Sequence, residues 1–271
     1  ITKDVEDITK KVSIKNTSFN VLISGMDSYG TINKTTRNDV NMIATINPNT
    51  NKVLLTSIPR DYYVQLHGKT GYKDKLTHAG IYGINTVVQT IEDLFGIDIN
   101  YYVRVNFTTV ESLVNTIGPI EIYSDKAMSL DGCKYVVGTN TVNGKCALRF
   151  ARERHSYVEG DNHRIKNQQE VIKGIFNKLS KSAMVVTDYT SILDSLDGKF
   201  ATNMDMKDIT AFIKYELEDI TKYEILDTQV TGTGSMELTY SYPHQKLYVM
   251  FPSEQSVESA KEYINKISNE K

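Results

Sequence analysis

The sequence predicts an α/β fold: a layered αβα sandwich around a central mixed β-sheet, in a single domain. Almost continuously apolar runs at 19–24 and 52–58 are typical of strands that are buried on both faces. Residues 81–96 and 164–179 instead carry their apolar residues at helical spacing. Because strands and helices alternate along the chain, we expect helices to cover both faces of one sheet.

In chain order, we expect strands at 19–24, 40–46, 52–58, 101–107 and 147–154, and helices at 81–96, 108–118 and 164–179. Glycines at 96 and 118 end two of the helices. Residues 200–271 should add a helix at about 207–219, three short strands and a final helix at about 253–268. Residues 1–18 are polar and charged, and we expect them to be a lead-in to one domain over 19–271, which no Pro-rich or Gly-rich linker divides.

Composition narrows the class of protein. Hydrophobic residues make up 40% and charged residues 24% of 271, as in ordinary globular domains. A formal net charge of -2 argues against a general nucleic-acid binder, which usually has a strongly basic face. No apolar run reaches the ~18 residues that a membrane span needs.

Arginine is used sparingly and is concentrated in one segment. The chain has seven arginines among 31 basic residues, and four of the seven lie within 149–164 (RFARERHSYVEGDNHR). A guanidinium is a planar fork that matches two phosphate oxygens, whereas an ammonium is a point charge. A requirement for surface charge alone would be met by lysine, so this segment predicts a phosphate-binding site.

If 147–154 is a strand, Arg152 and Arg154 point to the same side and Arg149 to the other, which leaves Arg149 out of the site. Arg164 opens the following helix, whose free N–H groups attract anions, and Gln168 lies one turn further on the same face. Asp161 either caps this helix or orients an arginine. The simpler interpretation is a charged loop with three acidic partners, Glu153, Glu159 and Asp161.

Further polar residues lie at the ends of the first three strands. They are Asp27 after the first, Arg37 and Asp39 before the second, and Arg60 and Asp61 after the third. Loops beyond the strand ends of open α/β sheets form the crevice where ligands bind. Taken singly, Asp27 is explained as a turn residue and Arg60 with Asp61 as a surface ion pair. Arg104, in an alternating strand, is interpreted as a solvent-facing charge.

Together these residues predict a pocket for a diphosphate-like group, with Asp27 and Asp39 holding a divalent metal. Oxygen ligands that share the metal with phosphate suit Mg²⁺, and Mn²⁺ is an alternative. His155 and His163 do not form a zinc pattern. The sequence has neither a P-loop nor a nucleophile elbow.

Two cysteines, Cys133 and Cys146, flank the turn-rich stretch KYVVGTNTVNGK. If this stretch is a hairpin, the cysteines lie opposite each other and can form a disulfide in an oxidising compartment. The alternative is two unpaired thiols in a reducing one.

The motifs together resemble the LytR-CpsA-Psr family of Gram-positive bacteria. They occur in order between about residues 19 and 180: a strand ending in G-x-D, then T-R-N-D, I-P-R-D, K-L-T-H-A, G-K-x-A-L-x-F-A-R-E-R-H and G-D-x-x-R-x-x-x-Q. Each motif alone is weak, and six in sequence order are specific.

The resemblance implies an extracytoplasmic domain tethered by one N-terminal membrane helix that precedes these residues. Such proteins transfer a glycopolymer, either teichoic acid or capsular polysaccharide, from a polyprenyl-pyrophosphate carrier to peptidoglycan. By the same resemblance, Asp27 and Asp39 match the Mg²⁺-associated acids. The residues that match the pyrophosphate-binding set are Arg37, Arg60, Lys75, Arg152, Arg154, Arg164 and Gln168.

The family also has a tunnel for the prenyl chain, and we expect the helices at 81–95 and 164–179 to wall it. Where many members have an arginine, this chain has Asn167, so one contact to the anion is expected to be lost or replaced. An extracytoplasmic location also favours oxidation of Cys133 and Cys146.

We therefore predict phosphoryl transfer, in which positioning and charge stabilisation dominate. Arg60, Arg152 and Arg154 are the predicted charge-stabilising groups, and Asp61 is either the base or an orienting residue. The alternatives are a polyprenyl-phosphate-binding regulator without turnover, a polyprenyl pyrophosphatase and, least favoured, a nucleic-acid regulator.

Overall fold

The computed structural model describes residues 8–14, 16–32, 35–157, 161–180, 189–205, 207–210 and 223–271. Its strands are β1 (Phe19–Met26), β2 (Val40–Asn47), β3 (Lys52–Ile58), β4 (Tyr63–Val64), β5 (Asp74–Lys75), β6 (Tyr101–Asn106), β7 (Ile120–Ser124), β8 (Met128–Leu130), β9 (Cys133–Tyr135), β10 (Gly138–Val142), β11 (Phe200–Thr202), β12 (Glu224–Gln229), β13 (Gly232–Glu237) and β14 (Leu247–Pro252). Its helices are α1 (Leu76–Ala79), the 3-10 turn η1 (Gly80–Tyr82), α2 (Ile84–Phe95), α3 (Phe107–Ile117), α4 (Gly144–Arg152), α5 (Asp161–Ser180), α7 (Tyr189–Ser195) and α9 (Glu254–Asn269).

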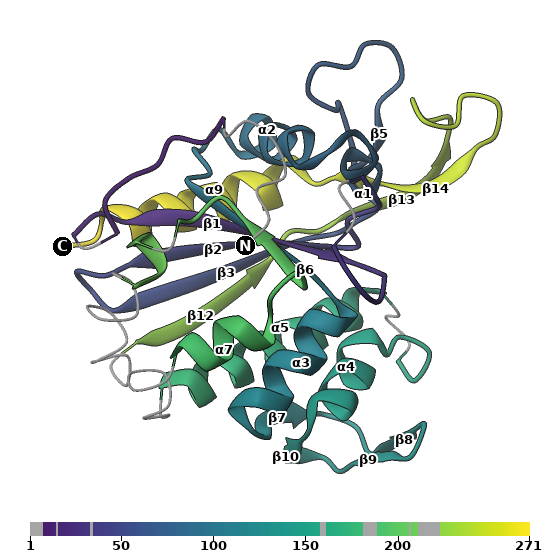
Figure 1. Ribbon diagram of the computed structural model, residues 1–271. Helices are drawn as coiled ribbons and strands as arrows, with labels where there is room; N and C mark the ends of the chain where they lie inside the picture. The colour runs from purple at the N-terminus through teal and green to yellow at the C-terminus, as the bar shows by residue number, and fades with distance from the viewer. Residues whose placement is uncertain are drawn as a thin grey trace.

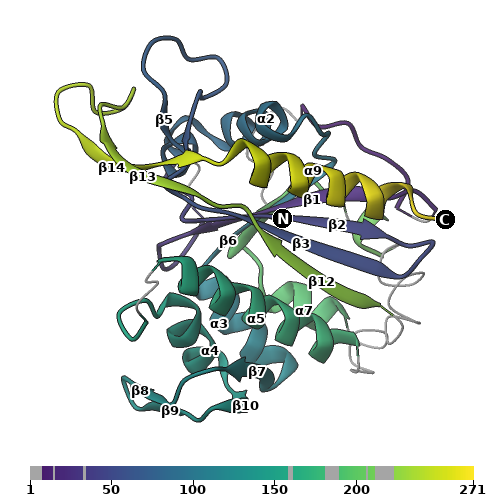
Figure 2. The same ribbon diagram turned by 180° about the vertical axis from the view of Figure 1, so that it is seen from behind.

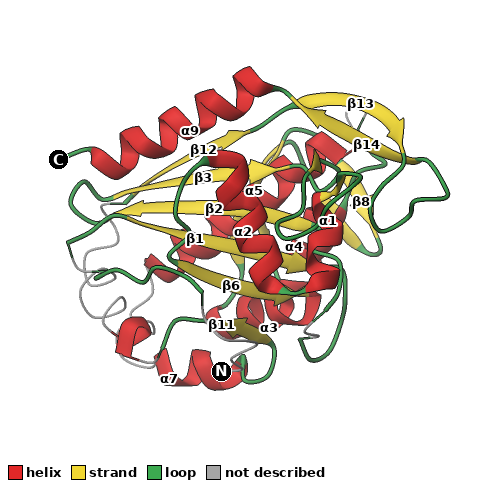
Figure 3. Cartoon of the chain, turned by 90° about the horizontal axis from the view of Figure 1, so that it is seen from above, coloured by secondary structure: helices red, strands yellow, loops and turns green. Residues whose placement is uncertain are grey.

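The central sheet is mixed, as predicted, with the strand order β11-β6-β1-β2-β3-β12. β1 runs parallel to β6 and β3 parallel to β12, whereas β2 is antiparallel to both of its neighbours. Helices α2 and α9 cover one face, and α3, α4, α5 and α7 lie on the other (Figures 1 and 2). Viewed from above, the strands of the sheet lie side by side and α2 crosses in front of them (Figure 3). The predicted layered αβα arrangement is confirmed.

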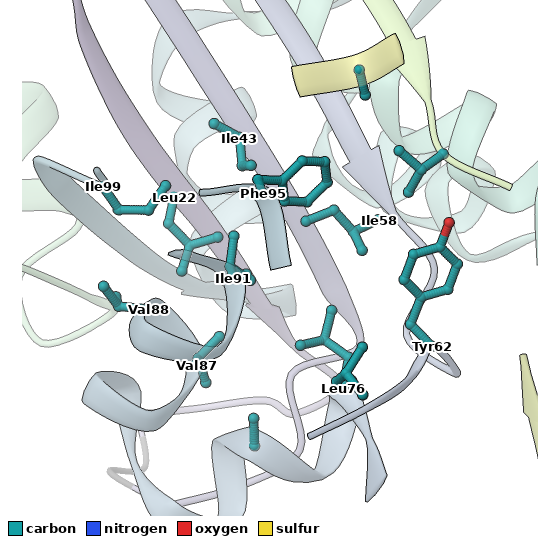
Figure 4. Packing of buried hydrophobic residues seen from close by; sticks show 14 of the residues in the cluster. Leu22, Ile43, Ile58, Tyr62, Leu76, Val87, Val88, Ile91, Phe95 and Ile99 are labelled. Carbon is teal, nitrogen blue, oxygen red and sulfur yellow. The ribbon is translucent and has the colours of Figure 1, made fainter. Parts of the chain in front are cut away.

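The strands have two apolar faces because neighbouring side chains alternate between them. Leu22 and Ile43, which pair across β1 and β2, pack against α2 and α9 in a cluster that includes Ile91 and Phe95 (Figure 4). Val21 and Ala44 point to the opposite face. Near-continuous apolar runs therefore mark strands that are buried on both sides.

Helix boundaries follow local capping. The side chain of Asn106 accepts a hydrogen bond from the backbone N–H of Thr109 at the start of α3. α2 ends at Gly96, which takes the left-handed conformation with φ 63° and donates its N–H to the carbonyl of Glu92. Both helices match their predicted ranges to within a few residues, whereas the helix predicted at 207–219 lies largely outside the described residues.

The cysteine pair forms a disulfide, but not across a hairpin. Cys133 lies in β9 and Cys146 in the first turn of α4, and their sulfurs are bonded. The stretch between them splits into β9, which pairs with β8, and β10, which pairs with β7. The bond therefore joins the β8–β9 hairpin to the helix that carries two of the arginines.

Residues 8–14 and 16–18 lie against the body of the domain. The carbonyl of Val12 accepts a hydrogen bond from the Tyr101 hydroxyl at 2.7 Å, and that of Lys10 accepts one from the Asn100 side chain at 2.8 Å. Ile14 is buried. Among the residues that the structure describes, none of the helices has the length and apolarity to span a membrane.

Candidate active site

The predicted acidic and basic residues at the strand ends come together at one edge of the sheet. β1 and β3 both end there and β2 begins there, because β2 is antiparallel to its neighbours. Gly25, opposite Val40 in the register, permits this close approach: a Cβ on Gly25 would lie 2.7 Å from the Cβ of Val40. Asp27, Asp39 and Arg60 consequently line one cavity.

Arg60 is held between two carboxylates. Its Nη1 lies 3.3 Å from Oδ1 of Asp39, and its Nε lies 3.7 Å from Oδ2 of Asp61. Lys75 forms an ion pair with Oδ1 of Asp61, and the hydroxyl of Thr77 donates to Oδ1 of Asp39 at 2.9 Å. Asp61 is buried and is flanked by two cations, an arrangement that favours an orienting role over that of a base.

α4 corrects the prediction of a strand at 147–154. Asn143 caps the helix by accepting a hydrogen bond from the backbone N–H of Cys146. Ala147, Leu148 and Phe150 are buried, at a spacing that fits a helix better than a strand. Because these apolar residues also alternate with arginines, the segment resembles a strand in sequence. The capping hydrogen bond of Asn143 distinguishes the helix from a strand.

As a result, Arg149 and Arg152 lie one turn apart on the same helical face, and both line the cavity. Nη2 of Arg152 is 3.7 Å from Oδ1 of Asp27, and its guanidinium lies 4.1 Å from the ring centroid of Phe107. Nη1 of Arg149 lies 3.1 Å from a carboxylate oxygen of Asp131 in the β8–β9 turn. The exclusion of Arg149 from the site, which assumed a strand, was wrong.

Three other predicted residues also line the cavity. Arg154 follows α4, with its Nε 3.4 Å from Nε2 of His155. Arg164 and Gln168 lie one turn apart near the start of α5 and face the cavity together, as predicted. The predicted capping or orienting role of Asp161 depends on its side chain, which lies outside the described residues.

Two arginines, Arg37 and Arg104, do not line the cavity. Arg104 is 2% exposed, with Nη2 3.2 Å from the sulfur of Met26, so its interpretation as a solvent-facing charge was wrong. Arg37 is exposed and donates to the Tyr242 hydroxyl at 3.2 Å, at the same edge of the sheet. Asn167 is buried and donates to the carbonyl of Phe150, which ties α5 to α4 instead of facing the anion site.

The cavity extends from these charged groups along the face of the sheet that carries Val21 and Ala44. Its volume is about 890 Å³. From Val40 to Ile46 it follows β2 for about 20 Å, at the usual rise of a strand. Apolar side chains line this part, and they come from β1, β2, β3, β6, α3 and α5: Val21, Ile23, Ala44, Ile46, Val53, Leu55, Val103, Val105, Val110, Leu113, Val171, Ile172, Ile175 and Phe176.

Of the two helices that were expected to wall the tunnel, one lines the cavity and the other does not. The helix at 164–179, within α5, lines it as predicted. The helix at 81–95 does not, because α2 packs on the opposite face of the sheet, where Val88, Ile91 and Phe95 are buried (Figure 4). α3 supplies the second helical wall, through Val110 and Leu113.

Asp27 and Asp39 suit a metal ion whose other ligands are phosphate oxygens and water. Asp27 and Asp39 both line the charged end of the cavity, and each also faces an arginine. In the part of the chain that the structure describes, no group of three or more His, Cys, Asp or Glu side chains could hold a metal ion. Mg²⁺ is commonly held by one or two carboxylates together with substrate phosphates and water, so this donor set suits it.

A buried network that the sequence analysis did not single out supports the site. Nδ1 of His78 lies 2.6 Å from Oδ1 of Asp74, and both side chains are buried. The backbone N–H of Ser241 donates to Oδ2 of Asp74 at 2.9 Å. The network fixes α1, and α1 carries Thr77, which contacts Asp39. The signal in the sequence was the Asp-Lys-Leu-Thr-His spacing, in which His78 follows Asp74 by four residues as the chain passes from β5 into α1.

An arginine-rich end that continues into a long apolar cavity is typical of proteins that bind amphipathic anions. The LytR_cpsA_psr family model matches residues 2–262. The chain belongs to the LytR-CpsA-Psr family.

Individual relatives agree with this assignment. The chain is 32% identical over 228 residues to the polyisoprenyl-teichoic acid–peptidoglycan teichoic acid transferase TagU of Enterococcus faecalis, covering 83% of this chain and 73% of the relative. It is 34% identical over 231 residues to TagU of Bacillus subtilis, covering 83% and 72%. The crystal structure of B. subtilis TagU matches with a TM-score of 0.71 at 28% identity, covering 94% of this chain and 98% of that one. The Lin1025 protein of Listeria innocua matches with a TM-score of 0.75 at 30% identity, covering 95% and 100%.

The Asp74–His78 pair predicts acid-dependent stability. Burial by itself raises the pKa of Asp74, but hydrogen bonds from His78 and Ser241 outweigh it and hold the pKa below its ordinary 3.8. The carboxylate therefore stabilises the fold fully above about pH 3.8. This contribution is lost as the pH falls through the lower pKa of the folded state. Asp74→Asn should lower the free energy of unfolding by about 3 kcal/mol at neutral pH.

Urea unfolding of wild type and Asp74→Asn across the acid range measures this. We expect the difference between the two proteins to shrink below pH 3.8. Asp93→Asn is the matched control, because Asp93 also contacts a histidine, His67, but on the surface. A difference for Asp74→Asn that stays constant with pH would contradict the assignment.

Proposed function

We propose that this chain is a phosphotransferase that moves an anionic glycopolymer from a polyprenyl-diphosphate carrier to peptidoglycan. One observation carries the proposal: guanidinium groups and carboxylates surround one end of a cavity whose remainder is apolar. A diphosphate head group matches the charged end, and a polyprenyl chain matches the apolar part. The names of the relatives supply the polymer class, teichoic acid, and the acceptor, peptidoglycan.

In the proposed reaction, a sugar hydroxyl of peptidoglycan attacks the phosphorus atom that carries the glycopolymer. The bond from this phosphorus to the bridging oxygen breaks, and polyprenyl phosphate leaves with the hydroxyl proton. Arg152 and Arg154 bind the non-bridging oxygens, where charge develops in the transition state. Arg60 is oriented for the same task by Asp39 and Asp61, and Lys75 adds a second positive charge next to Asp61. Arg164 and Gln168 complete the binding of the head group.

We also propose that Asp27 and Asp39 hold Mg²⁺ together with the diphosphate. The bound ion would neutralise phosphate charge and fix the orientation of the two phosphates. The location we propose is the outer face of the membrane, with a membrane helix preceding these residues, as the family resemblance implied. The disulfide and an acceptor in the cell wall both agree with an oxidising compartment.

A substitution that blocks the apolar part of the cavity should weaken binding of the prenyl tail and leave binding of the diphosphate head group unchanged. Ala44 is buried in β2 and lines the middle of the cavity, so Ala44→Phe places a ring where the prenyl chain would lie. We expect binding of a long-chain polyprenyl diphosphate to weaken at least about tenfold, since several buried methylene groups are displaced. Binding of inorganic pyrophosphate should be unchanged, as calorimetry of both ligands would show.

For comparison, Ile43→Phe enlarges a residue that points to the opposite face of the same strand. It should reduce stability without selective loss of the long-chain ligand. If Ala44→Phe bound the long chain as wild type does, the apolar cavity would not be the tail site.

The guanidinium fork should matter more than its charge. Arg154→Lys keeps the positive charge but loses bidentate binding, and we expect transfer to fall by about 10²-fold. Lys166→Arg, on α5 but outside the cavity lining, is the control with the reverse exchange. The assay follows polymer linked to peptidoglycan against polymer released to water, which also distinguishes a transferase from a pyrophosphatase. Unimpaired transfer by Arg154→Lys would refute the role of Arg154.

Removal of the metal gives an independent check. Treatment with EDTA should abolish transfer, and Mg²⁺ should restore it. Asp39→Asn should raise the Mg²⁺ concentration needed for half-maximal activity by about tenfold, because one of two carboxylate ligands is lost. Activity that persists in EDTA would remove the metal from the proposal.

A further inference from the structure

We infer that the arm formed by β13 and β14 binds the pyranose rings of the acceptor, a peptidoglycan glycan strand. The inference rests on the proposed function, because it assigns the surface that receives the second substrate. The arm extends beyond the sheet at the edge where the charged residues gather (Figures 1 and 3). β12 is parallel to β3, so the chain leaves the sheet at that edge just before β13 begins.

The base of the arm is fixed to the active-site loop. The backbone N–H of Met250 in β14 donates to the carbonyl of Asp61 at 2.7 Å. The hydroxyl of Tyr62 donates to the carbonyl of Thr231 at 2.6 Å. Any group bound to this strand is therefore held at a defined distance from Asp61 and its neighbour Arg60.

One face of the arm carries an exposed aromatic platform, formed by Tyr248, Gly234 and Met236. Met236 pairs with Tyr248 across the two strands, and Gly234 pairs with Met250, so these side chains share a face. A Cβ on Gly234 would lie 2.8 Å from Cε2 and 2.9 Å from Oη of Tyr248, so the ring lies across the glycine. Tyr248 is 48% exposed and Met236 is 51% exposed. Glycine thus leaves room for the ring to lie along the strands with its other surface toward solvent.

A second tyrosine connects the platform to the charged site. Tyr242, in the loop that joins β13 to β14, accepts a hydrogen bond from Nη2 of Arg37 at 3.2 Å. Its ring centroid lies 5.2 Å from that of His78, next to the helix that carries Thr77. Tyr242 is 40% exposed. Partly exposed aromatic rings therefore occur both beside the charged residues and on the arm.

The chemistry of the arm suits an uncharged sugar ring. A pyranose has an apolar face of C–H groups, which packs on the electron-rich face of an aromatic ring, and a rim of hydroxyl groups. The segments 232–237 and 247–252 contain no lysine or arginine. A polyanionic donor chain would be expected to select cations, as the cavity end does, so the platform fits the acceptor better than the donor.

The position of the arm argues against a membrane as its partner. The apolar cavity runs from the charged site toward Ile46 and Val53, at the opposite edge of the sheet. The N-terminal segment contacts Asn100 and Tyr101 near that same opposite edge. The apolar cavity and the described N-terminal residues therefore both lie away from the arm.

The test uses peptidoglycan sacculi that have been stripped of teichoic acid. Tyr248→Ala should weaken cosedimentation with sacculi and raise the KM for the acceptor by about fivefold, the scale of one lost aromatic contact. Tyr248→Phe should retain most of the binding. Gly234→Ala should also weaken it, because the added methyl group displaces the ring. Tyr123→Ala removes a ring that is 54% exposed on β7 and should change nothing.

Each alternative outcome is distinguishable. Wild-type affinity of Tyr248→Ala for sacculi would overturn the inference, as would selective loss of binding to soluble teichoic acid or to anionic phospholipid vesicles. Polyprenyl-diphosphate binding should be equal in all four variants. If wild-type protein transfers no polymer to any acceptor, the proposed function fails. If transfer is intact but Tyr248→Ala leaves the acceptor KM unchanged, only the inference fails.

Discussion

The organisation of the site depends on pairing between cations and carboxylates at one edge of the sheet. Several guanidinium groups close together repel one another, and their burial is costly unless each has a counter-charge. Asp39 and Asp61 hold Arg60, Asp27 faces Arg152, and Asp131 faces Arg149. The acids thus neutralise the arginines where they lie, so that the guanidinium groups can stay at the cavity wall instead of extending into solvent. A polyanionic ligand then meets donors that are already oriented, which reduces the entropy lost on binding.

The elements that local patterns determine could be predicted from the sequence. The first three strands were recognisable because burial on both faces leaves an almost unbroken apolar run. Asp27, Arg60 and Asp61 were recognisable because each follows a run at a turn signal, and Arg37 and Asp39 because they directly precede the second run. Antiparallel pairing of β2 then brings Asp27, Asp39 and Arg60 to one edge. This part of the candidate site needed only the strand positions and the general rule about strand ends.

Features that depend on tertiary contacts were harder to predict from the sequence. α4 was taken for a strand because its apolar residues also alternate with arginines, and the capping role of Asn143 was overlooked. Arg104 occupies an interior position next to Met26, which strand alternation alone does not reveal. The face of the sheet on which a helix packs is not encoded in its own periodicity. For this reason α2 was expected to line the cavity, although α3 does so instead.

The apolar cavity has a consequence for the protein's persistence in the envelope. Between the sheet and helices α3 and α5, a bound tail, as proposed above, would add a hydrophobic layer to the interior. By mass action, a ligand that binds only the folded state adds RT ln(1 + [L]/Kd) to its stability, about 2.7 kcal/mol at a hundredfold excess over Kd. If the carrier binds there, its supply sets how long the molecule survives proteolysis. When carrier becomes scarce, turnover of this polypeptide should rise in step.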